Sequence, residues 1–449
     1  MTPKRKISLL LAVTAALSGA ALLLGQDIRD FITKNAGKPA LAVVEFRGSG
    51  SQPQMAAFNS TLFSDLENSG LFELRPRSSY PLDNPQRPED LRPADNNQGF
   101  ALADWAGAPV NASHLVFGYT AAQNGVLAVY GYLDETRPSN PQAAQLLGQR
   151  YVGTLDDAGA IRAAHQYAAD IISKFGGSGS LLGSRIYFVS DRSGSSEIWA
   201  MDWDGTNQTQ LTTLKSTSIM PAISPDGSRI AFTTFAKGTP GIMIVDTETK
   251  RVVPFYNQQA SMNATPGFTP DGKQIFYSST ASGTAQIYAA QVNGQDFRRI
   301  SHREAIEVEP KINPKNPSMM LFVAGPGHQQ IYQMSTEGIG VERVTNGEGE
   351  ASNPAWHPDG QHLAFSWTSG IAKGDFNVFV MDIGSRQYVQ LTHGEGRNEN
   401  PTWGPDGRHL VFASTRTGKS QIYTMLADGS QVKQLTTQGV NRFPVWGVK

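Results

Sequence analysis

The sequence contains no cysteine, which excludes disulfide bonds, thiolate metal sites and a thiol nucleophile. It also lacks an excess of charge of either sign. Its 38 Lys and Arg residues face 39 Asp and Glu residues, which leaves a formal net charge of -1. A chain with this balance carries no electrostatic signal for nucleic acid or for an anionic membrane. We therefore expect no nucleic-acid partner.

Catalytic and cofactor motifs are missing as well. The sequence has no G-x-S-x-G turn of the serine hydrolases, no P-loop, and no G-x-G-x-x-G between a strand and a helix. The histidines are scattered, and His357 and His362 merely flank one turn. Residues 202–205 (Asp-Trp-Asp-Gly) resemble a cation-binding loop, but the other repeats place ordinary turns there. We predict no enzyme activity, no small-molecule substrate, no cofactor and no bound metal.

Glycine and proline are abundant, with 45 and 26 residues, and only 17% of the residues are charged. This composition is typical of a turn-rich β protein rather than a helical one. A length of 449 residues leaves room for two or three domains.

The N-terminus has the pattern of an export signal. Three basic residues, 4–6, precede 19 uncharged and mostly apolar residues from Ile7 to Gly25. A run of that length could also span a membrane as a retained anchor. Its many Ala, Ser, Thr and Gly residues favour cleavage instead. We predict a signal peptide at residues 1–25 and an exported mature chain.

Residues 26–179 are predicted to form a small α/β domain. An apolar run at 40–46 indicates a buried strand, and a second short strand is expected at 71–74. Between them, apolar residues from Met55 to Leu66 have the spacing of one helix face.

The same domain continues with a hairpin and a closing helix. Asn124-Gly125 lies between two β-type runs, 114–119 and 126–132, which is a strong hairpin signal. A strand near 146–152 and an amphipathic helix from Ile161 to Phe175 follow. Glycine and serine at 176–180 indicate a flexible linker, which predicts a domain boundary there.

A seven-residue phrase recurs along the rest of the chain. Its fullest copies read Pro-x-x-x-Pro-Asp-Gly, and degraded copies keep the leading proline and a hydrophobic residue two positions later. The leading prolines are 45, 44, 44, 47 and 43 residues apart. They are Pro221, Pro266, Pro310, Pro354, Pro401 and Pro444. A fixed period in this range is typical of a stacked or circular array.

Each repeat contains four short strand patterns, the last with a Gln-Leu-Thr theme. Four short strands, six times over, predict a six-bladed β-propeller over residues 180–449. The first repeat lacks its proline strand, whereas the chain ends with an extra one. Residues 443–448 should therefore pair beside 185–189 and close the ring. The predicted fold is mostly β, a C-terminal six-bladed β-propeller preceded by a small α/β domain.

Within each blade, Pro-Asp-Gly is interpreted as a type I turn and its aspartate as a turn residue rather than a catalytic acid. Large residues such as Trp356 and Trp403 should pack between blades. The loops before the leading prolines vary most, and they carry a charged, net acidic rim. They are residues 216–220, 257–265, 302–309, 346–353, 393–400 and 437–443. We interpret the rim as a docking surface for a protein or peptide, with a merely solvated face as the alternative.

Together these features resemble the TolB family, periplasmic components of the Tol–Pal cell-envelope system. They include the export signal, Pro-x-x-x-Val-Val-x-Phe at 39–46, Asn-Ser-Gly-Leu-Phe at 68–72, and six blades closed by the C-terminus. The resemblance implies a non-enzymatic scaffold in the periplasm. Such a scaffold links the peptidoglycan-associated lipoprotein Pal at the outer membrane to inner-membrane Tol proteins, and it supports envelope integrity and cell division. We expect a monomer.

The resemblance also implies partner sites. In this family Pal docks at the channel mouth of the propeller, and the matching positions are Met262, Asn263, Ala264, Thr265, Val308 and Glu309. Met262 departs from the family, where polar residues are usual. An N-terminal peptide of the family switches between packing on the body and binding TolA. The matching residues are Asp27, Ile28, Arg29, Asp30, Phe31 and Ile32.

Two alternatives stand beside this interpretation: a propeller joined to a hydrolase, as in peptidases of the prolyl oligopeptidase type, and a periplasmic propeller that binds a sugar or a metal. Only nine residues follow Val440, so no hydrolase domain is expected behind the ring. The first domain also lacks a nucleophile motif.

Overall fold

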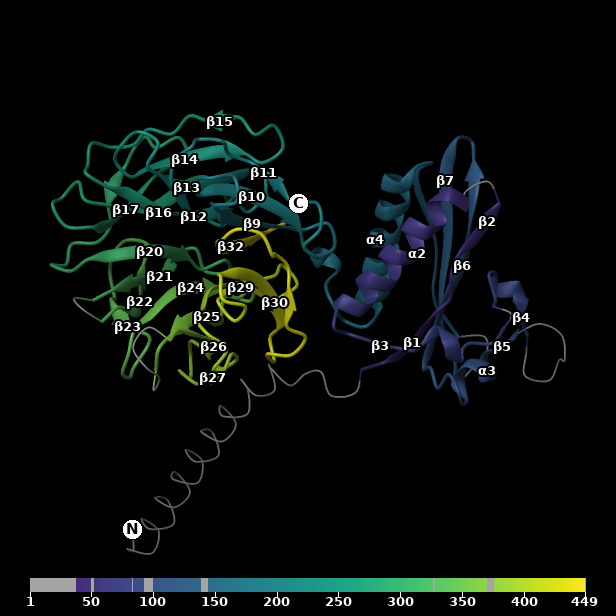
Figure 1. Ribbon diagram of the computed structural model, residues 1–449. Coiled ribbons are helices and arrows are strands. Elements are labelled where there is room, and N and C mark those ends of the chain that lie inside the picture. The colour runs from purple at the N-terminus through teal and green to yellow at the C-terminus, as the bar shows by residue number, and fades with distance from the viewer. Residues whose placement is uncertain are drawn as a thin grey trace, which may run out of the picture. The chain divides into compact units, whose positions relative to one another are not determined.

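The computed structural model describes residues 38–49, 52–82, 84–92, 100–138, 144–325, 328–369 and 375–448. The predicted signal peptide, 1–25, and the predicted TolA-type peptide, 27–32, lie outside the described residues. The chain divides into two compact units (Figure 1), the first ending at Gly183 and the second beginning at Ser184. This division falls slightly after the predicted boundary at residues 179–180.

The first unit is built on a mixed sheet with strand order β3-β1-β6-β7-β8, in which β2 also pairs with β6. The strands are β1 (Ala40–Val43), β2 (Arg47–Ser49), β3 (Glu73–Leu74), β6 (His114–Gln123), β7 (Val126–Glu135) and β8 (Gln145–Thr154). β1 is parallel to β3 and β6, whereas β6, β7 and β8 are antiparallel. Asn124 and Gly125 join β6 to β7 with φ of 52° and 76°, as a two-residue hairpin turn requires.

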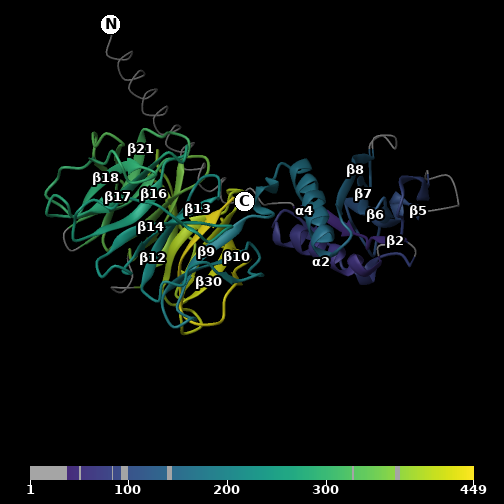
Figure 2. The same ribbon diagram turned by 90° about the horizontal axis from the view of Figure 1, so that it is seen from above.

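Two long helices cover one face of this sheet (Figure 2). The helices of the unit are α2 (Gln52–Asn68), α3 (Leu102–Ala106) and α4 (Asp157–Lys174). α2 and α4 bury apolar side chains such as Phe58 and Ile171 against the strands. α4 begins before the predicted Ile161 because Asp156 caps it, its carboxylate accepting a hydrogen bond from Gly159 N at 2.7 Å.

The opposite face of the sheet carries smaller elements. They are α3, β4 (Leu91–Arg92) and β5 (Phe100–Ala101). Trp105 of α3 is fully buried there against Leu115 and Phe117 of β6. The first unit therefore has apolar packing on both sides of one sheet, as the sequence predicts for an α/β domain.

The second unit consists of six four-stranded antiparallel sheets, as predicted, and we call them blades 1 to 6 in chain order. Blade 1 contains β9 (Arg185–Ser190), β10 (Glu197–Asp202), β11 (Thr209–Gln210) and β32 (Asn441–Gly447). Blade 2 contains β12 (Ser218–Ile223), β13 (Arg229–Thr234), β14 (Gly241–Asp246) and β15 (Val252–Val253). Blade 3 contains β16 (Asn263–Phe268), β17 (Gln274–Ser279), β18 (Gln286–Gln291) and β19 (Arg298–Arg299).

The remaining blades repeat this order. Blade 4 contains β20 (Glu307–Ile312), β21 (Met319–Ala324), β22 (Gln330–Ser335) and β23 (Glu342–Arg343). Blade 5 contains β24 (Ala351–Trp356), β25 (His362–Trp367), β26 (Asn377–Asp382) and β27 (Tyr388–Gln390). Blade 6 contains β28 (Asn398–Trp403), β29 (His409–Ser414), β30 (Gln421–Leu426) and β31 (Lys433–Gln434).

The C-terminal strand closes the ring (Figure 1). β32 pairs antiparallel with β9, so that Val445 lies opposite Tyr187 and Trp446 opposite Ile186. The Trp446 indole donates a hydrogen bond from Nε1 to Ser184 Oγ at 2.8 Å, and both residues are buried. The predicted pairing of 443–448 with 185–189 is confirmed. It leaves neither the first blade nor the chain end with an unpaired inner edge.

The turns and the Gln-Leu-Thr theme hold each blade together. In the Pro-Asp-Gly turn of blade 5, Gly360 N donates to His357 O at 2.9 Å, as a type I turn requires. In blade 4, Thr345 Oγ1 accepts a hydrogen bond from the β22 backbone at 3.0 Å and donates to Gln330 Oε1 at 2.8 Å. Blades 1, 3, 5 and 6 have the same hydroxyl clasp. Blade 2 differs because Gly241 stands at the position of Gln330.

Candidate docking channel

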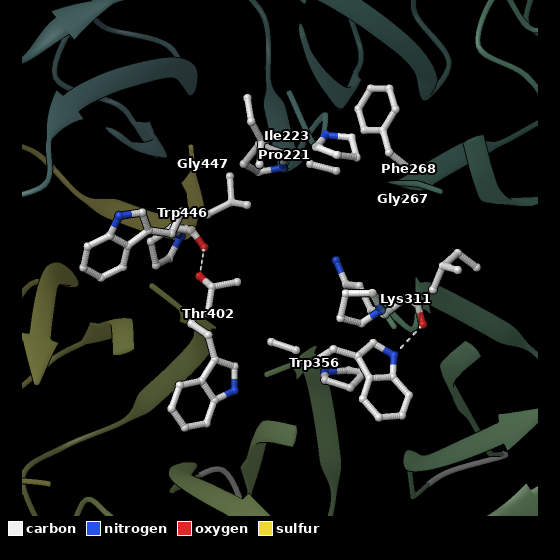
Figure 3. A pocket seen from close by; sticks show the side chains of 18 of the residues that line it. Pro221, Ile223, Gly267, Phe268, Lys311, Trp356, Thr402, Trp446 and Gly447 are labelled. Atoms are coloured by element: carbon white, nitrogen blue, oxygen red, sulfur yellow. Dashed lines mark hydrogen bonds between the residues drawn. The ribbon is translucent and has the colours of Figure 1, made fainter. Parts of the chain in front are cut away.

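The inner strands of the six blades surround a central channel that holds a cavity of about 580 Å³ (Figure 3). This volume lies in the range of sites for small ligands. Five leading prolines line it: Pro221, Pro266, Pro354, Pro401 and Pro444. The hydrophobic residues two positions after the leading prolines also line it: Ile223, Phe268, Ile312, Trp356, Trp403 and Trp446. Because proline has no N–H to donate, this wall is largely apolar.

Every inner strand carries a β-bulge just before its leading proline, where the register of pairing shifts. The residue before the proline has a φ between 50° and 57° in each blade, a region that non-glycine residues seldom adopt. These residues are Met220, Thr265, Glu309, Asn353, Asn400 and Phe443. All six line the cavity, and we call them the bulge ring. A bulge bends its strand and re-aims a side chain, so each blade contributes one residue to the channel wall.

Hydrogen bonds link neighbours in the bulge ring. Thr265 Oγ1 accepts from Glu309 N at 3.2 Å, and the Glu309 carboxylate accepts from Asn353 N at 3.0 Å. Ser366 Oγ donates to Asn353 Oδ1 at 3.1 Å and accepts from Asn400 N, also at 3.1 Å. A continuous polar chain therefore connects blades 3 to 6 around the channel.

Blade 4 brings charged side chains into the channel wall, with Glu309 and Lys311 on its inner strand and Lys315 in the turn that follows. Burial raises the pKa of Glu309 above its ordinary value, while the Lys311 charge and the hydrogen bonds from Asn353 act in the opposite direction. Burial lowers the pKa of Lys311, and the Glu309 charge offsets only part of that effect. The ionised forms of both side chains are therefore disfavoured by the channel itself.

Two of the six residues predicted for Pal docking, Thr265 and Glu309, lie in the bulge ring and are joined by the hydrogen bond described above. The structure thus brings together one residue from each of the two loops that the resemblance selected. The Glu309 carboxylate keeps part of its surface open to the cavity.

The other four residues predicted for Pal docking lie in or beside the same two strands. Asn263 and Ala264 are buried, and Asn263 Nδ2 donates to a loop carbonyl at 2.9 Å, so both residues support the loop. Val308 is half-buried and packs against the apolar core shared by blades 4 and 5. Met262 is half-buried, and its backbone N–H donates to Thr280 Oγ1 at 2.9 Å.

Sequence reasoning did not single out Asn353, Asn400 or Lys311. The repeats themselves carry the signal that would have found them. When the repeats are aligned on the leading proline, Asn353 and Asn400 fall at the position before it, and Lys311 falls at the position after it.

A cluster at the turn end of blade 5 joins His357, Asp359 and His362. The Asp359 carboxylate lies 2.9 Å from His357 Nδ1 and 2.7 Å from His362 Nδ1. Burial alone would raise the pKa of Asp359, but the hydrogen bonds from the two imidazoles hold it well below its usual range. The other ring nitrogen of His357 bonds to Gly407 O at 2.8 Å. Because these atoms already bond to one another, the cluster clasps the turn, and blade 6 repeats its aspartate–histidine pair.

Within the part of the chain that the structure describes, no helix combines the length and the apolar composition that are needed to cross a membrane.

Comparisons with known proteins agree with the propeller architecture. Residues 172–352 and 340–448 match the family model described as the TolB beta propeller domain. The chain is 32% identical over 305 residues to a protein TolB homolog of Chlorobium luteolum, which covers 68% of each chain. It is 38% identical over 195 residues to the Tol-Pal system protein TolB of Bordetella pertussis, which covers 43% of this chain and 44% of that protein.

The fold resembles the crystal structure of TolB from Acinetobacter baumannii, with a TM-score of 0.75 and 21% identity. The similarity covers 92% of this chain and 98% of that one, and so extends over both units. The family model alone accounts for more than half of the sequence. This chain therefore belongs to the TolB family.

Proposed function

We propose that this protein is a non-enzymatic periplasmic scaffold of the Tol-Pal system, and that it docks the lipoprotein Pal at the mouth of its propeller channel. The observation that carries the proposal is the bulge ring, which places six side chains of five different kinds on one otherwise repetitive wall. A surface that differs from blade to blade can recognise an asymmetric partner. The names of the relatives in Chlorobium and Bordetella support the assignment to this system.

The rim around the mouth supports recognition of a protein rather than catalysis. Some of its charges pair with one another: Arg397 lies 2.7 Å from Glu399, and Arg416 lies 2.8 Å from Glu395. Charges arranged in this way orient an incoming protein and exclude wrong partners. The Glu309 carboxylate already accepts hydrogen bonds from Asn353, and the prolines around it offer no donors, which suits binding better than proton transfer.

The second partner in the proposal is TolA, which would bind the segment from Asp27 to Ile32. That segment alternates charged and apolar residues ahead of the first strand of the α/β domain. A scaffold that holds Pal on the propeller and TolA on its N-terminal peptide would link the two membranes of the envelope. Truncation of residues 27–32 should abolish TolA binding and leave the Pal affinity of the propeller measurable.

The test is calorimetric titration of the full mature chain with Pal from the same organism. Met262→Arg places a long charged side chain in the loop that enters the inner strand of blade 3 and should weaken Pal binding by about ten-fold or more, equivalent to about 1.4 kcal/mol. Lys273→Ala is the matched control because Lys273 is exposed on a Pro-Asp-Gly turn, at the other end of blade 3. An affinity that is equally unaffected in both folded variants would refute the docking site. Absence of Pal binding to the unmodified chain would refute the function.

A further inference from the structure

Lys311 is an exception in the sixfold repeat of the channel wall. It follows the leading proline of blade 4 directly. The corresponding residues of blades 2 to 6 and then blade 1, in chain order, are Ala222, Gly267, Lys311, Ala355, Thr402 and Val445. Five of these six positions hold an uncharged side chain or none. A charge at this position is therefore not a requirement of the blade architecture.

The Lys311 side chain points from β20 toward the open centre of the channel, as Figure 3 shows. Its backbone faces the wall, where the carbonyl oxygen accepts a hydrogen bond from Trp356 Nε1 at 2.9 Å. In blade 3, a Cβ on Gly267 would lie 2.6 Å from Pro310 O, so that position cannot carry a side chain without a shift of the backbone. The residue of blade 3 that corresponds to Lys311 therefore adds no side chain to the channel wall.

Among the residues that the structure describes, no acceptor forms a hydrogen bond or an ion pair with the Lys311 ammonium. Glu309 is an opposite charge that acts on Lys311, but its carboxylate is held by Asn353 N at 3.0 Å and by Asn353 Nδ2 at 3.4 Å. The favourable effect of Glu309 does not overcome burial, which keeps the pKa of Lys311 below its ordinary value. Lys311 is half-buried, and an ammonium that is partly removed from water without a hydrogen-bonded partner is costly in a protein unless something else compensates it.

We propose that Lys311 is the binding site for a carboxylate that a docking partner inserts into the channel. The identity of that partner rests on the proposed function. The residues that line the cavity determine which kind of side chain the partner can insert. Prolines and aromatic rings make up much of the wall, and the Lys311 side chain points from it toward the centre. The occupant is therefore an acidic side chain flanked by apolar residues in an extended peptide segment of the partner. Its carboxylate forms a charge-assisted hydrogen bond with the Lys311 ammonium, and its apolar neighbours lie against the walls.

The first experiment tests the subsite without any protein partner. Thermal unfolding of the full chain is measured at neutral pH in sodium acetate and in sodium chloride of equal ionic strength. The wild-type melting temperature should rise with acetate above the chloride baseline, because a ligand that binds only the native state stabilises it. Lys311→Met should lose this rise. Lys315→Met should keep it, since Lys315 also lines the cavity but is an exposed residue at its turn end. A wild type without the acetate response, or a Lys311→Met protein that retains it, overturns the proposal.

The second experiment separates binding from an internal structural role. If Lys311 serves only as the counter-charge of Glu309, Lys311→Met lowers the melting temperature in the absence of carboxylates and Glu309→Gln restores it. If Lys311 serves an incoming carboxylate, Lys311→Met melts at or above the wild-type temperature under those conditions. The first pattern overturns the proposal, and the second supports it while showing that the variant folds.

Titration with Pal then links the subsite to docking. Lys311→Met should weaken Pal binding by at least about ten-fold, the effect of removing one member of a buried charge pair, while Lys315→Met leaves it unchanged. If Pal does not bind the wild type but the acetate response is present, the proposed function is refuted and the carboxylate site is supported. If the wild type and Lys311→Met bind Pal equally well and acetate has no effect, the carboxylate site is refuted and the docking function is supported.

Discussion

The hydrogen bond that closes the ring allows a quantitative test of the architecture. Trp446 comes from the last strand of the chain and Ser184 from the start of the propeller, and both are buried, with 6% and 2% of their surfaces exposed. Their Nε1–Oγ bond is 2.8 Å long. Ser184→Ala leaves the buried indole N–H without an acceptor, which costs about 1–3 kcal/mol. Trp446→Phe removes this hydrogen bond from the serine hydroxyl and also removes ring atoms, so its cost should be at least as large.

The double variant distinguishes the bond from the rest of the packing. When both partners are absent, no buried donor is left unsatisfied, so the second substitution should add much less than it does alone. We expect a coupling energy of about 1–2 kcal/mol between the two sites. Denaturant unfolding followed by circular dichroism suits this cycle, because Trp446→Phe also changes the fluorescence. Each kcal/mol corresponds to about 2–4 °C in melting temperature for a domain of 150–250 residues.

Additive free energies, within about 0.5 kcal/mol, would contradict this reasoning. They would mean that the two side chains do not bond in solution and that β32 closes the ring through its backbone and apolar contacts alone. Ser190→Ala is a useful control. Ser190 lies at the opposite end of β9, where it pairs with Asn441 and bonds to Arg192 rather than to Trp446. Its effect on the free energy of unfolding should therefore add to that of Trp446→Phe.

Four further predictions concern other contacts in the structure. Gly241→Ala should stabilise the protein by about 0.5–1 kcal/mol, because a Cβ there meets no atom closer than Asn257 Oδ1 at 3.5 Å. Gly267→Ala should instead destabilise it by about 1–3 kcal/mol because of the 2.6 Å contact with a backbone oxygen, and calorimetry distinguishes the two signs. Glu309→Gln should raise the free energy of unfolding at neutral pH, and this gain should vanish below about pH 4.5. The raised pKa of Glu309 means that the native state favours the protonated carboxyl. Ionisation of Glu309 therefore destabilises the native state only as the pH rises past the unfolded pKa of 4.5 and through the higher folded pKa. Asp359→Asn should cost about 1.5–3 kcal/mol at neutral pH, where the ionised carboxylate accepts from two imidazoles, and denaturant midpoints that match the wild type would contradict that role.

Much of the propeller could be predicted because its repeats carry the same turn at nearly constant spacing. Pro-Asp-Gly fixes where the first strand of a blade ends and the second begins, and the excess strand at the C-terminus fixes how the ring closes. The α/β unit was predictable for a different reason. Asn124-Gly125 can join its strands only by a tight turn, and the helix that ends near Phe175 has a clear apolar face.

The channel wall was less predictable because its geometry comes from β-bulges, which interrupt the regular alternation of strand residues. The sequence places Thr265 and Glu309 before prolines, but only the paired strands show that those residues form bulges with positive φ. A strand pattern assigns alternate residues to alternate faces, and a bulge resets that alternation. The family resemblance selected Asn263 and Ala264, which are buried, together with Glu309, which lines the cavity, and strand alternation alone could not have separated them.

Closure of the ring and asymmetry of its wall are connected. Five of the six blades have a hydroxyl clasp, and all six are held by strand pairing and by apolar contacts between sheets, so the blade architecture does not require one particular side chain beside the leading proline. Those positions can therefore change without unfolding the propeller, as the series from Ala222 to Val445 demonstrates within one chain. A charged residue such as Lys311 can stand there although its burial is unfavourable, because the strand pairing of the whole ring keeps the propeller folded. The repeat supplies a stable wall, and the departures from the repeat at Glu309 and Lys311 are where selectivity for a partner can arise.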